Sequence, residues 1–186
     1  LEDRVTALDF SPDGRLLASG GGVAARNGEL KIWNVATGKL VREVIAAHSD
    51  TVFCVRFSPD GKTLASGAAD KCLKTFDVDT GTFVRTFEGH THHVLGVAWS
   101  ADGRRLYASG ATFETVHTFA FADGFLSSPV DFPLRPEAET GIPVGLATDA
   151  KGGLYVAEGW GQRVDKLKAD SGKLVWSVTL ATTPPG

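Results

Sequence analysis

The stretch FSPDGRLLASG at residues 10–20 returns almost unchanged as FSPDGKTLASG at residues 57–67. Two looser copies follow, WSADGRRLYASG at residues 99–110 and ATDAKGGLYVAEG at residues 147–159. After each copy comes a second phrase: KIWNVATGKLV, KTFDVDTGTFV, HTFAFADGFLS or DKLKADSGKLV. The turn glycines of these second phrases are 43, 43 and 48 residues apart: Gly38, Gly81, Gly124 and Gly172. One unit of about 40 to 45 residues is therefore used four times.

Each unit predicts four short strands. Asp-Gly lies between the first two strands, and Thr-Gly, Asp-Gly or Ser-Gly lies between the last two. In the second unit we expect strands at about Val52–Phe57, Thr63–Gly67, Cys72–Asp77 and Thr82–Phe87. The first of these, VFCVRF, is mostly apolar, as a strand buried on both faces should be. Such a sheet is not stable alone, so the sequence predicts an all-β protein whose four sheets stack as the blades of a β-propeller.

We expect a single propeller domain over residues 1–186, with blades at approximately 1–47, 48–89, 90–132 and 133–180 and a C-terminal tail at 181–186. Four blades of this kind form half of an eight-bladed ring. They leave two apolar end faces, which water penalises by roughly 25 cal/mol per Å². We therefore expect two chains to associate head to tail into a closed ring. A monomeric four-bladed ring and a segment of a larger propeller protein remain alternatives.

Composition excludes two classes of partner. The 186 residues include 19 basic and 22 acidic side chains, a net charge of −3, whereas a nucleic-acid-binding protein depends on clustered Lys and Arg. No apolar run approaches the roughly 18 residues of a membrane span. We expect neither nucleic acid nor membrane as a partner.

The repeats resemble a known family. Trp33-Asn34 and Phe76-Asp77 stand where WD repeats have their Trp-Asp pair, and Gly89-His90 matches the Gly-His of that family. The resemblance covers roughly residues 2–121, with Phe119 as the third signature aromatic. The fourth unit, IPVGLATDAKGGLYVAEGWGQRVDKL, is more similar to NHL-type or YVTN-type propeller repeats, and ADSGKLVW is similar to quinoprotein blades.

These resemblances imply three functions. The first is a non-catalytic scaffold for protein interaction. The second is a propeller segment of a redox enzyme, because bacterial WD-repeat and YVTN-type segments occur beside c-type cytochrome domains. The third is an engineered propeller chimera without a native ligand. CxxCH is absent, and we expect no cofactor.

His48, Ser66 and Asp70 include the residue types of a nucleophilic triad. The WD-repeat resemblance implies a structural role instead: a hydrogen-bonded chain from the loop histidine to the strand hydroxyl, the turn aspartate and the signature aromatic. Because Phe76 has no N–H, we expect this chain to end at Asp70.

His90 and Ser109 repeat half of this pattern, with Phe113 in place of the aspartate. His90, His92 and His93 could together attract a transition metal, but no acidic or Cys ligand lies nearby in sequence, and we expect no metal site.

Cys54 and Cys72 fall on the first and third strands of one sheet, roughly 9.6 Å apart, so we expect free thiols. Cys54 aligns with Ala7, Gly96 and Gly145, a position that requires a small side chain. Glu137 and Glu139, on a Pro-rich loop, are interpreted as solvated.

Two long connections predict where a partner binds, since function on a repeat scaffold usually lies in its loops. GGGVAARNGE follows the second strand of the first unit, and FPLRPEAETGIP leads into the fourth unit. Both should lie at the same rim. The candidate residues for binding an unknown protein or peptide there are Arg26, His92, His93, Phe113, Arg135 and Trp160. Alternatively, Phe113 and Trp160 only cover the ends of adjacent blades. Four residues should surround the channel mouth: Arg4, Thr51, His93 and Ile142.

Overall fold

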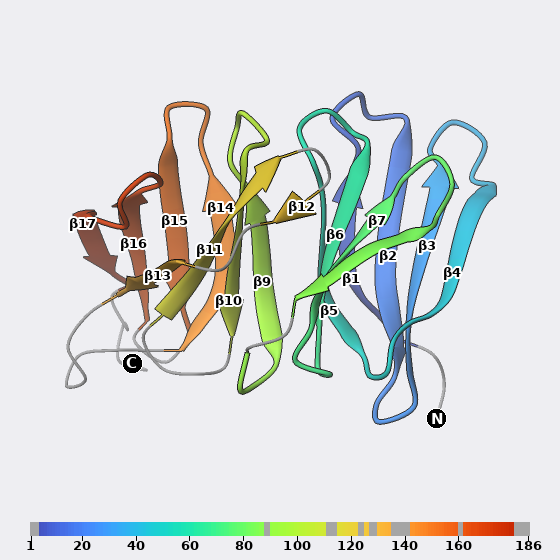
Figure 1. Ribbon diagram of the computed structural model, residues 1–186, viewed down its shortest axis with the longest axis horizontal. Coiled ribbons are helices and arrows are strands. Elements are labelled where there is room, and N and C mark those ends of the chain that lie inside the picture. The colour runs from blue at the N-terminus through green and yellow to red at the C-terminus, as the bar shows by residue number, and fades with distance from the viewer. Residues whose placement is uncertain are drawn as a thin grey trace, which may run out of the picture.

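The computed structural model describes residues 4–87, 90–110, 115–122, 125–126, 130–134, 142–159 and 162–180. Within these ranges every regular element is a β-strand, and the strands form four separate antiparallel sheets (Figure 1). The prediction of an all-β protein built from four repeated sheets is confirmed. No helix long and apolar enough to cross a membrane occurs in the described ranges.

Sheets 1 and 2 are meanders of four strands in chain order. Sheet 1 contains β1 (Arg4–Phe10), β2 (Leu16–Val23), β3 (Asn27–Asn34) and β4 (Leu40–His48). Sheet 2 contains β5 (Val52–Phe57), β6 (Thr63–Ala68), β7 (Leu73–Asp77) and β8 (Phe83–Phe87). The strands expected for the second unit differ from these by one residue at most, because the Asp-Gly and Thr-Gly turns fix where each strand ends.

Sheet 3 has an outer strand in two pieces. It contains β9 (Val94–Trp99), β10 (Arg105–Gly110) and β11 (Thr115–Ala122), and both β12 (Phe125–Leu126) and β13 (Val130–Pro133) pair with β11. Sheet 4 returns to the simple meander: β14 (Pro143–Thr148), β15 (Gly153–Glu158), β16 (Arg163–Lys168) and β17 (Leu174–Thr179).

The core lies between the sheets, in three layers. In each layer one face of a sheet, here called its leading face, packs on the receiving face of the next sheet along the chain. Ala18, Leu30 and Ile32 of the sheet 1 leading face pack on Val55 and Phe57 of sheet 2. The same arrangement joins sheet 2 to sheet 3 and sheet 3 to sheet 4. Stacking therefore buries both faces of sheets 2 and 3.

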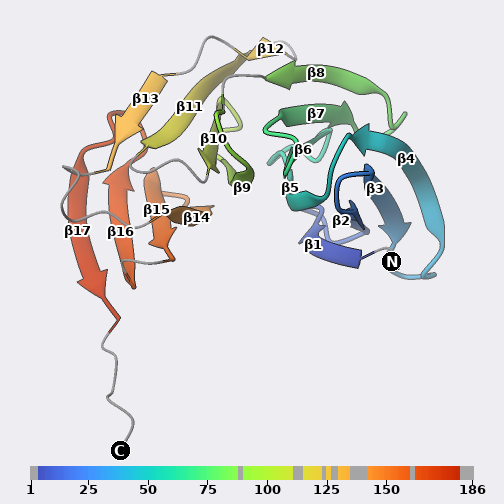
Figure 2. The ribbon, with the colours of Figure 1, turned by 90° about the horizontal axis from the view of Figure 1, so that it is seen from below.

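Seen along the strands, the four sheets fan out into an arc that is open on one side (Figure 2). The first strand of each sheet, β1, β5, β9 and β14, lies on the inner side of the arc, and β4, β8 and β17 lie on the outer side. Sheets 1 and 4 flank the opening. Their outward faces carry large exposed apolar side chains, including Phe10 at 59% and Trp176 at 41% relative exposure.

Candidate functional site

The first strands of the four sheets line the inner wall of the arc, and each of them has a β-bulge at the same place. Pairing between the first and second strand of every sheet skips one residue, which is the signature of a β-bulge. The skipped residues are Thr6, Phe53, Leu95 and Val144. All four line one groove of about 290 Å³.

Sequence analysis missed these four residues. The signal was the column of small residues that immediately follows them: Ala7, Cys54, Gly96 and Gly145. The structure explains that column by the close approach of neighbouring inner strands. A Cβ on Gly96, for example, would lie 3.4 Å from Gly145 Cα of the next sheet.

At one rim this wall opens into a pocket of about 350 Å³. Arg4 and Thr6 come from sheet 1, Val23 and Ala24 from the end of β2 and the turn after it, Asp50, Thr51, Phe53 and Ala69 from sheet 2, and His93 from the entry to sheet 3. The long loop expected at GGGVAARNGE is instead a longer hairpin, because β2 runs to Val23 and β3 begins at Asn27. Segments of three sheets therefore meet at this rim, including the turn of that hairpin.

The pocket has an aromatic wall and a fixed carboxylate. The rings of Phe53 and His93 lie 5.6 Å apart at 44°. Asp50 Oδ1 accepts the backbone N–H of Ala25 at 2.8 Å and that of Thr51 at 2.7 Å, and these two hydrogen bonds, led by that of Ala25, hold the pKa of Asp50 below its ordinary value. The Asp50 carboxylate thereby ties the turn between β2 and β3 of sheet 1 to sheet 2.

Of the candidate rim residues, His93 lines this pocket. Arg26 and His92 are exposed, and Arg26 lies two residues beyond Ala24 of the lining. Three candidates lie outside the described residues: Phe113, Arg135 and Trp160. Glu137 and Glu139 also lie outside them. Among the residues expected at the channel mouth, Arg4, Thr51 and His93 line the pocket, and Ile142 is not part of its lining.

His48, Ser66 and Asp70 form a buried hydrogen-bonded chain. His48 Nδ1 lies 3.0 Å from both carboxylate oxygens of Asp70, and His48 Nε2 lies 2.7 Å from Ser66 Oγ. Burial lowers the pKa of His48, so the ring is neutral, with Nδ1–H donating to Asp70 and Nε2 accepting from Ser66. Burial alone would raise the pKa of Asp70, but the bond to His48 and the N–H groups of Cys72 and Ser49 outweigh it and lower the pKa to about 2.

The chain differs from its expected order. It ends at Ser66, not at Asp70, because the histidine stands in the middle and the serine is the group next to the signature aromatic. Sheet 1 shows the missing link, since Trp33 Nε1 donates to Ser19 Oγ at 2.9 Å. Phe76 lacks that donor and instead packs its ring against His48, with ring centroids 6.5 Å apart.

The expected pairing of His90 with Ser109 is wrong. Ser66 pairs with Val55 of the inner strand, and its counterpart in sheet 3, paired with Val97, is Ala108. Unit three has one extra residue before its Ala-Ser-Gly, which turns Ser109 to the other face of the sheet. Among the described residues, neither ring nitrogen of His90 nor Oγ of Ser109 has a hydrogen-bond partner.

His90 instead belongs to a small cluster on the outer part of sheet 3. Its ring meets that of His117 edge to face, with centroids 4.4 Å apart, and His117 Nδ1 lies 2.6 Å from Asp131 Oδ1. Burial and the neighbouring His117 lower the pKa of His90 to about 4. In the described part of the chain, no group of three or more His, Cys, Asp or Glu side chains is arranged to hold a metal ion.

The two cysteines are free thiols, as expected from their separation. Cys54 is buried between sheets 2 and 3, where burial raises the pKa of its thiol to about 12. Cys72 is half-buried in the turn before β7.

A larger cavity of about 790 Å³ lies between sheets 3 and 4 at the opposite rim. Four basic side chains reach its lining, against two carboxylates: Arg104, Arg105, Lys151 and Lys168, with Asp102 and Asp170. Arg105 is occupied in holding the two sheets together, since its guanidinium donates to the carbonyl of Ala169 at 2.9 Å.

Solved structures resemble this arrangement. The WD40 repeats of RRP9 superpose with a TM-score of 0.78 at 21% identity, covering 94% of this chain and 51% of that one. The structure of U3-55K gives the same TM-score and covers 52% of that chain. The likeness shows the propeller fold, and this chain spans about half of each neighbour.

Curated relatives are similar over shorter stretches. Cell division cycle 20.1, cofactor of APC complex, from Arabidopsis thaliana is 29% identical over 77% of this chain and 30% of that protein. WD repeat and SOCS box-containing protein 1 from Homo sapiens is 32% identical over 55% of this chain and 24% of that protein. The chain thus spans less than a third of the length of these two relatives.

Two family models match, and the boundary between them lies in the second unit, earlier than the boundary before the fourth unit that the repeats suggested. The WD domain, G-beta repeat, matches residues 2–34, and the SMP-30/gluconolactonase/LRE-like region matches residues 55–185. The chain therefore belongs to the family of the SMP-30/gluconolactonase/LRE-like region, and its first unit also matches the WD-repeat model.

Proposed function

We propose that this protein is a non-catalytic scaffold that binds a peptide segment of a partner protein at the channel mouth. The observation that carries the proposal is the pocket formed by Arg4, Phe53 and His93, into which segments of three sheets converge. The name of the Arabidopsis relative, a cofactor of a complex, supports a role in assembly.

The chemistry of the pocket favours a particular kind of segment. The paired rings of Phe53 and His93 suit an apolar or aromatic side chain, since aromatic residues commonly anchor interfaces. Arg4 adds a permanent positive charge at the edge, and Arg26 extends it along the rim. We therefore expect the segment to combine an apolar anchor with a carboxylate. Phe113, Arg135 and Trp160 are proposed to continue the same surface.

A selection from a random peptide library tests this proposal. Peptides selected on the wild-type protein should lose at least tenfold in affinity for Phe53→Ala and for His93→Ala. His92→Ala is the matched control, because His92 is equally exposed but does not line the pocket. Peptides that bind all three variants equally, or a selection that yields no binder, would contradict the proposal.

The second part of the proposal is that two copies complete the ring. Its support is the pair of exposed apolar faces at the opening of the arc, which a closed ring would cover. Size-exclusion chromatography with light scattering should give about 40 kDa for two chains of 19.6 kDa each. A mass near that of one chain at micromolar concentration would contradict ring closure but not peptide binding.

A further inference from the structure

The receiving faces of sheets 2 and 3 carry the same three neighbours: an aromatic residue, a leucine and a second aromatic residue. In sheet 2, Phe57 lies opposite Leu64, and Leu64 lies opposite Phe76. In sheet 3 the corresponding residues are Trp99, Leu106 and Phe119. The preceding sheet covers all six, whose relative exposure is at most 6%.

Sheet 1 has these three neighbours without a cover. Phe10 lies opposite Leu17, and Leu17 lies opposite Trp33. A hollow of about 290 Å³ lies over them and extends to Val35 and Gly38. Sheet 1 is therefore a receiving face with the side chains of sheets 2 and 3, and no described part of the chain covers it.

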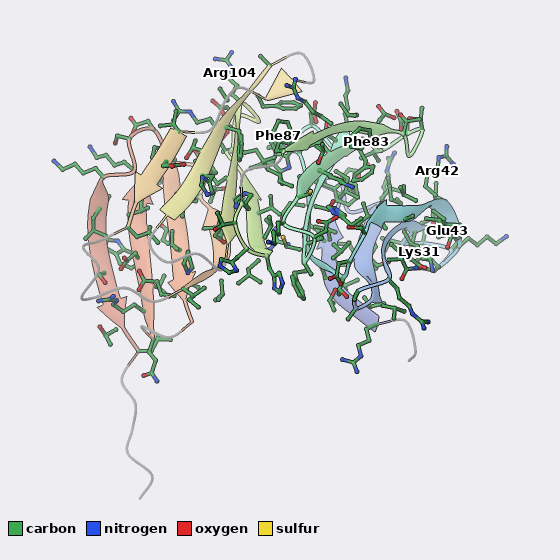
Figure 3. All side chains as sticks on the ribbon, turned by 60° about the horizontal axis from the view of Figure 1, so that its bottom comes forward. Lys31, Arg42, Glu43, Phe83, Phe87 and Arg104 are labelled. Carbon is green, nitrogen blue, oxygen red and sulfur yellow. The ribbon has the colours of Figure 1, made fainter. Side chains whose placement is uncertain are left out.

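Charged side chains lie beside this hollow. Lys31 Nζ lies 3.0 Å from Glu29 and 3.2 Å from Glu43, and Figure 3 shows Lys31 and Glu43 side by side. An apolar centre with a polar margin is the usual anatomy of a protein interface.

Sheet 4 supplies the complementary leading face. Tyr155 follows Leu154 as Tyr107 follows Leu106 in sheet 3. Tyr107 is fully buried, and its hydroxyl donates to the carbonyl of Ala169 in the next sheet at 2.8 Å.

Ala169 belongs to sheet 4, and the residue at the equivalent position of sheet 1 is Val35. The N–H of each residue donates to the turn between the first two strands of its own sheet, Ala169 to Gly152 and Val35 to Arg15. Val35 also borders the uncovered hollow. The acceptor that Tyr155 would need is therefore present on the other open face.

The outer strand of sheet 4, β17, has side chains at the positions by which β4 of sheet 1 contacts sheet 2. In sheet 1, Arg42 pairs with Ile32 and Val44 with Leu30, and both lie over Gly81 of sheet 2, where an added Cβ would be 3.7 Å from Val44. In sheet 4 the corresponding positions are Trp176 and Val178, which are 41% and 52% exposed. The counterpart of Gly81 in sheet 1 is Gly38, around which a Cβ would meet nothing within 4 Å.

Resting on the proposed ring closure, we infer that sheet 4 of one copy docks on sheet 1 of a second copy in the register of the internal interfaces. Tyr155 then covers Leu17 and donates to the Val35 carbonyl, while Trp176 and Val178 lie on Gly38. The occupant is a second copy because one chain carries both halves of the contact.

Docking requires one local change. In the single chain the Tyr155 hydroxyl donates to Asp149 Oδ2 at 2.8 Å, beside Lys166. When that hydroxyl turns to Val35, Asp149 keeps Lys166 at 3.1 Å and the N–H of Gly153 at 2.7 Å. No buried carboxylate is left unpaired by the change.

Light scattering on Phe10→Glu, Trp176→Glu and the control Val84→Glu tests this docking. Val84 is 43% exposed on β8, close to the 41% of Trp176, but sheet 2 has no open face. We expect the two terminal-face variants to have the mass of one chain, and Val84→Glu to have that of two. Circular dichroism should show the same β content in all of them.

A mixture of Phe10→Glu and Trp176→Glu is the decisive sample. A head-to-tail pair of these two variants contains one doubly substituted contact and one wild-type contact, so the mixture should regain the mass of two chains where each variant alone does not. A wild-type dimer that persists in both variants, or a mixture that stays monomeric, would overturn the docking and leave dimerisation standing. A monomeric wild-type protein would overturn both.

Discussion

Trp33 donates its indole N–H to Ser19 Oγ at 2.9 Å, and the residues at the same places in sheet 2 are Phe76 and Ser66. Both sheets therefore have a serine at this position, but the two serines bond to different partners. In sheet 1 it accepts from the aromatic, and in sheet 2 it bonds to His48 instead.

Replacing Ser66 by Ala should destabilise the protein by about 1–3 kcal/mol, because the buried His48 Nε2 loses its donor. Ser109→Ala is the matched control, since Ser109 is equally buried but its Oγ bonds to no group in the described part of the chain. We expect that variant to stay within about 0.5 kcal/mol of wild type. Urea unfolding measures both. Equal losses in the two variants would argue against the hydrogen-bonded chain as the source of stability.

Asp70 should make stability depend on acid pH. Its pKa lies at about 2, below its ordinary value of 3.8, so its contribution is complete above pH 4 and is lost as the pH falls toward 2. With allowance for partial solvent screening, the loss is about 1–2 kcal/mol. Asp70→Asn should flatten this part of the curve in urea unfolding between pH 5 and pH 3. An unchanged slope in that variant would show that other carboxylates determine it.

His90 should act in a higher pH range. Its pKa is about 4, below the ordinary 6.5, so the unfolded chain takes up the proton first and stability falls as the pH drops from 6.5 toward 4. His90→Phe should remove roughly 2 kcal/mol of the loss measured between pH 7.5 and pH 5. The exposed His92→Ala serves as the control and should retain the wild-type pH profile. The interpretation fails if His90→Phe retains it as well.

The thiols should differ in reactivity. With its pKa raised to about 12 by burial, Cys54 should resist iodoacetamide at pH 8 in the folded protein, whereas half-buried Cys72 should react. Mass spectrometry should therefore find one label on the native chain and two after unfolding in urea. Rapid labelling of Cys54 in the native protein would mean that sheets 2 and 3 separate readily.

The fold could be predicted from the sequence because its decisive signals are local. The Asp-Gly and Thr-Gly turns, such as those at Gly61 and Gly81, limit each strand to within one residue. Strand register was harder to predict. One extra residue before Ser109 moves the Ser109 side chain to the other face of sheet 3, although the strand keeps the same Ala-Ser-Gly sequence.

The candidate site was predicted only in part. The extra residues of the first unit pointed to the rim at which the pocket lies, and His93 and Arg4 do line that pocket. The sequence did not show that Phe53 contributes to the same wall, because a bulge residue looks like any other strand residue until its pairing is known. The order of Asp70, His48 and Ser66 likewise depended on distances between β4, β6 and the turn after β6, which residue spacing does not encode.

The four bulges separate what holds the protein together from what it can recognise. Phe53, Leu95 and Val144 stand outside the regular pairing between the first two strands, so their side chains can change without altering how those strands are joined. Thr6 differs, because its hydroxyl donates to the carbonyls of Gly20 and Val52 and so links β1 to its neighbours. Substitutions at the other three positions can therefore make the inner wall more apolar, more polar or more charged while the surrounding strands stay intact.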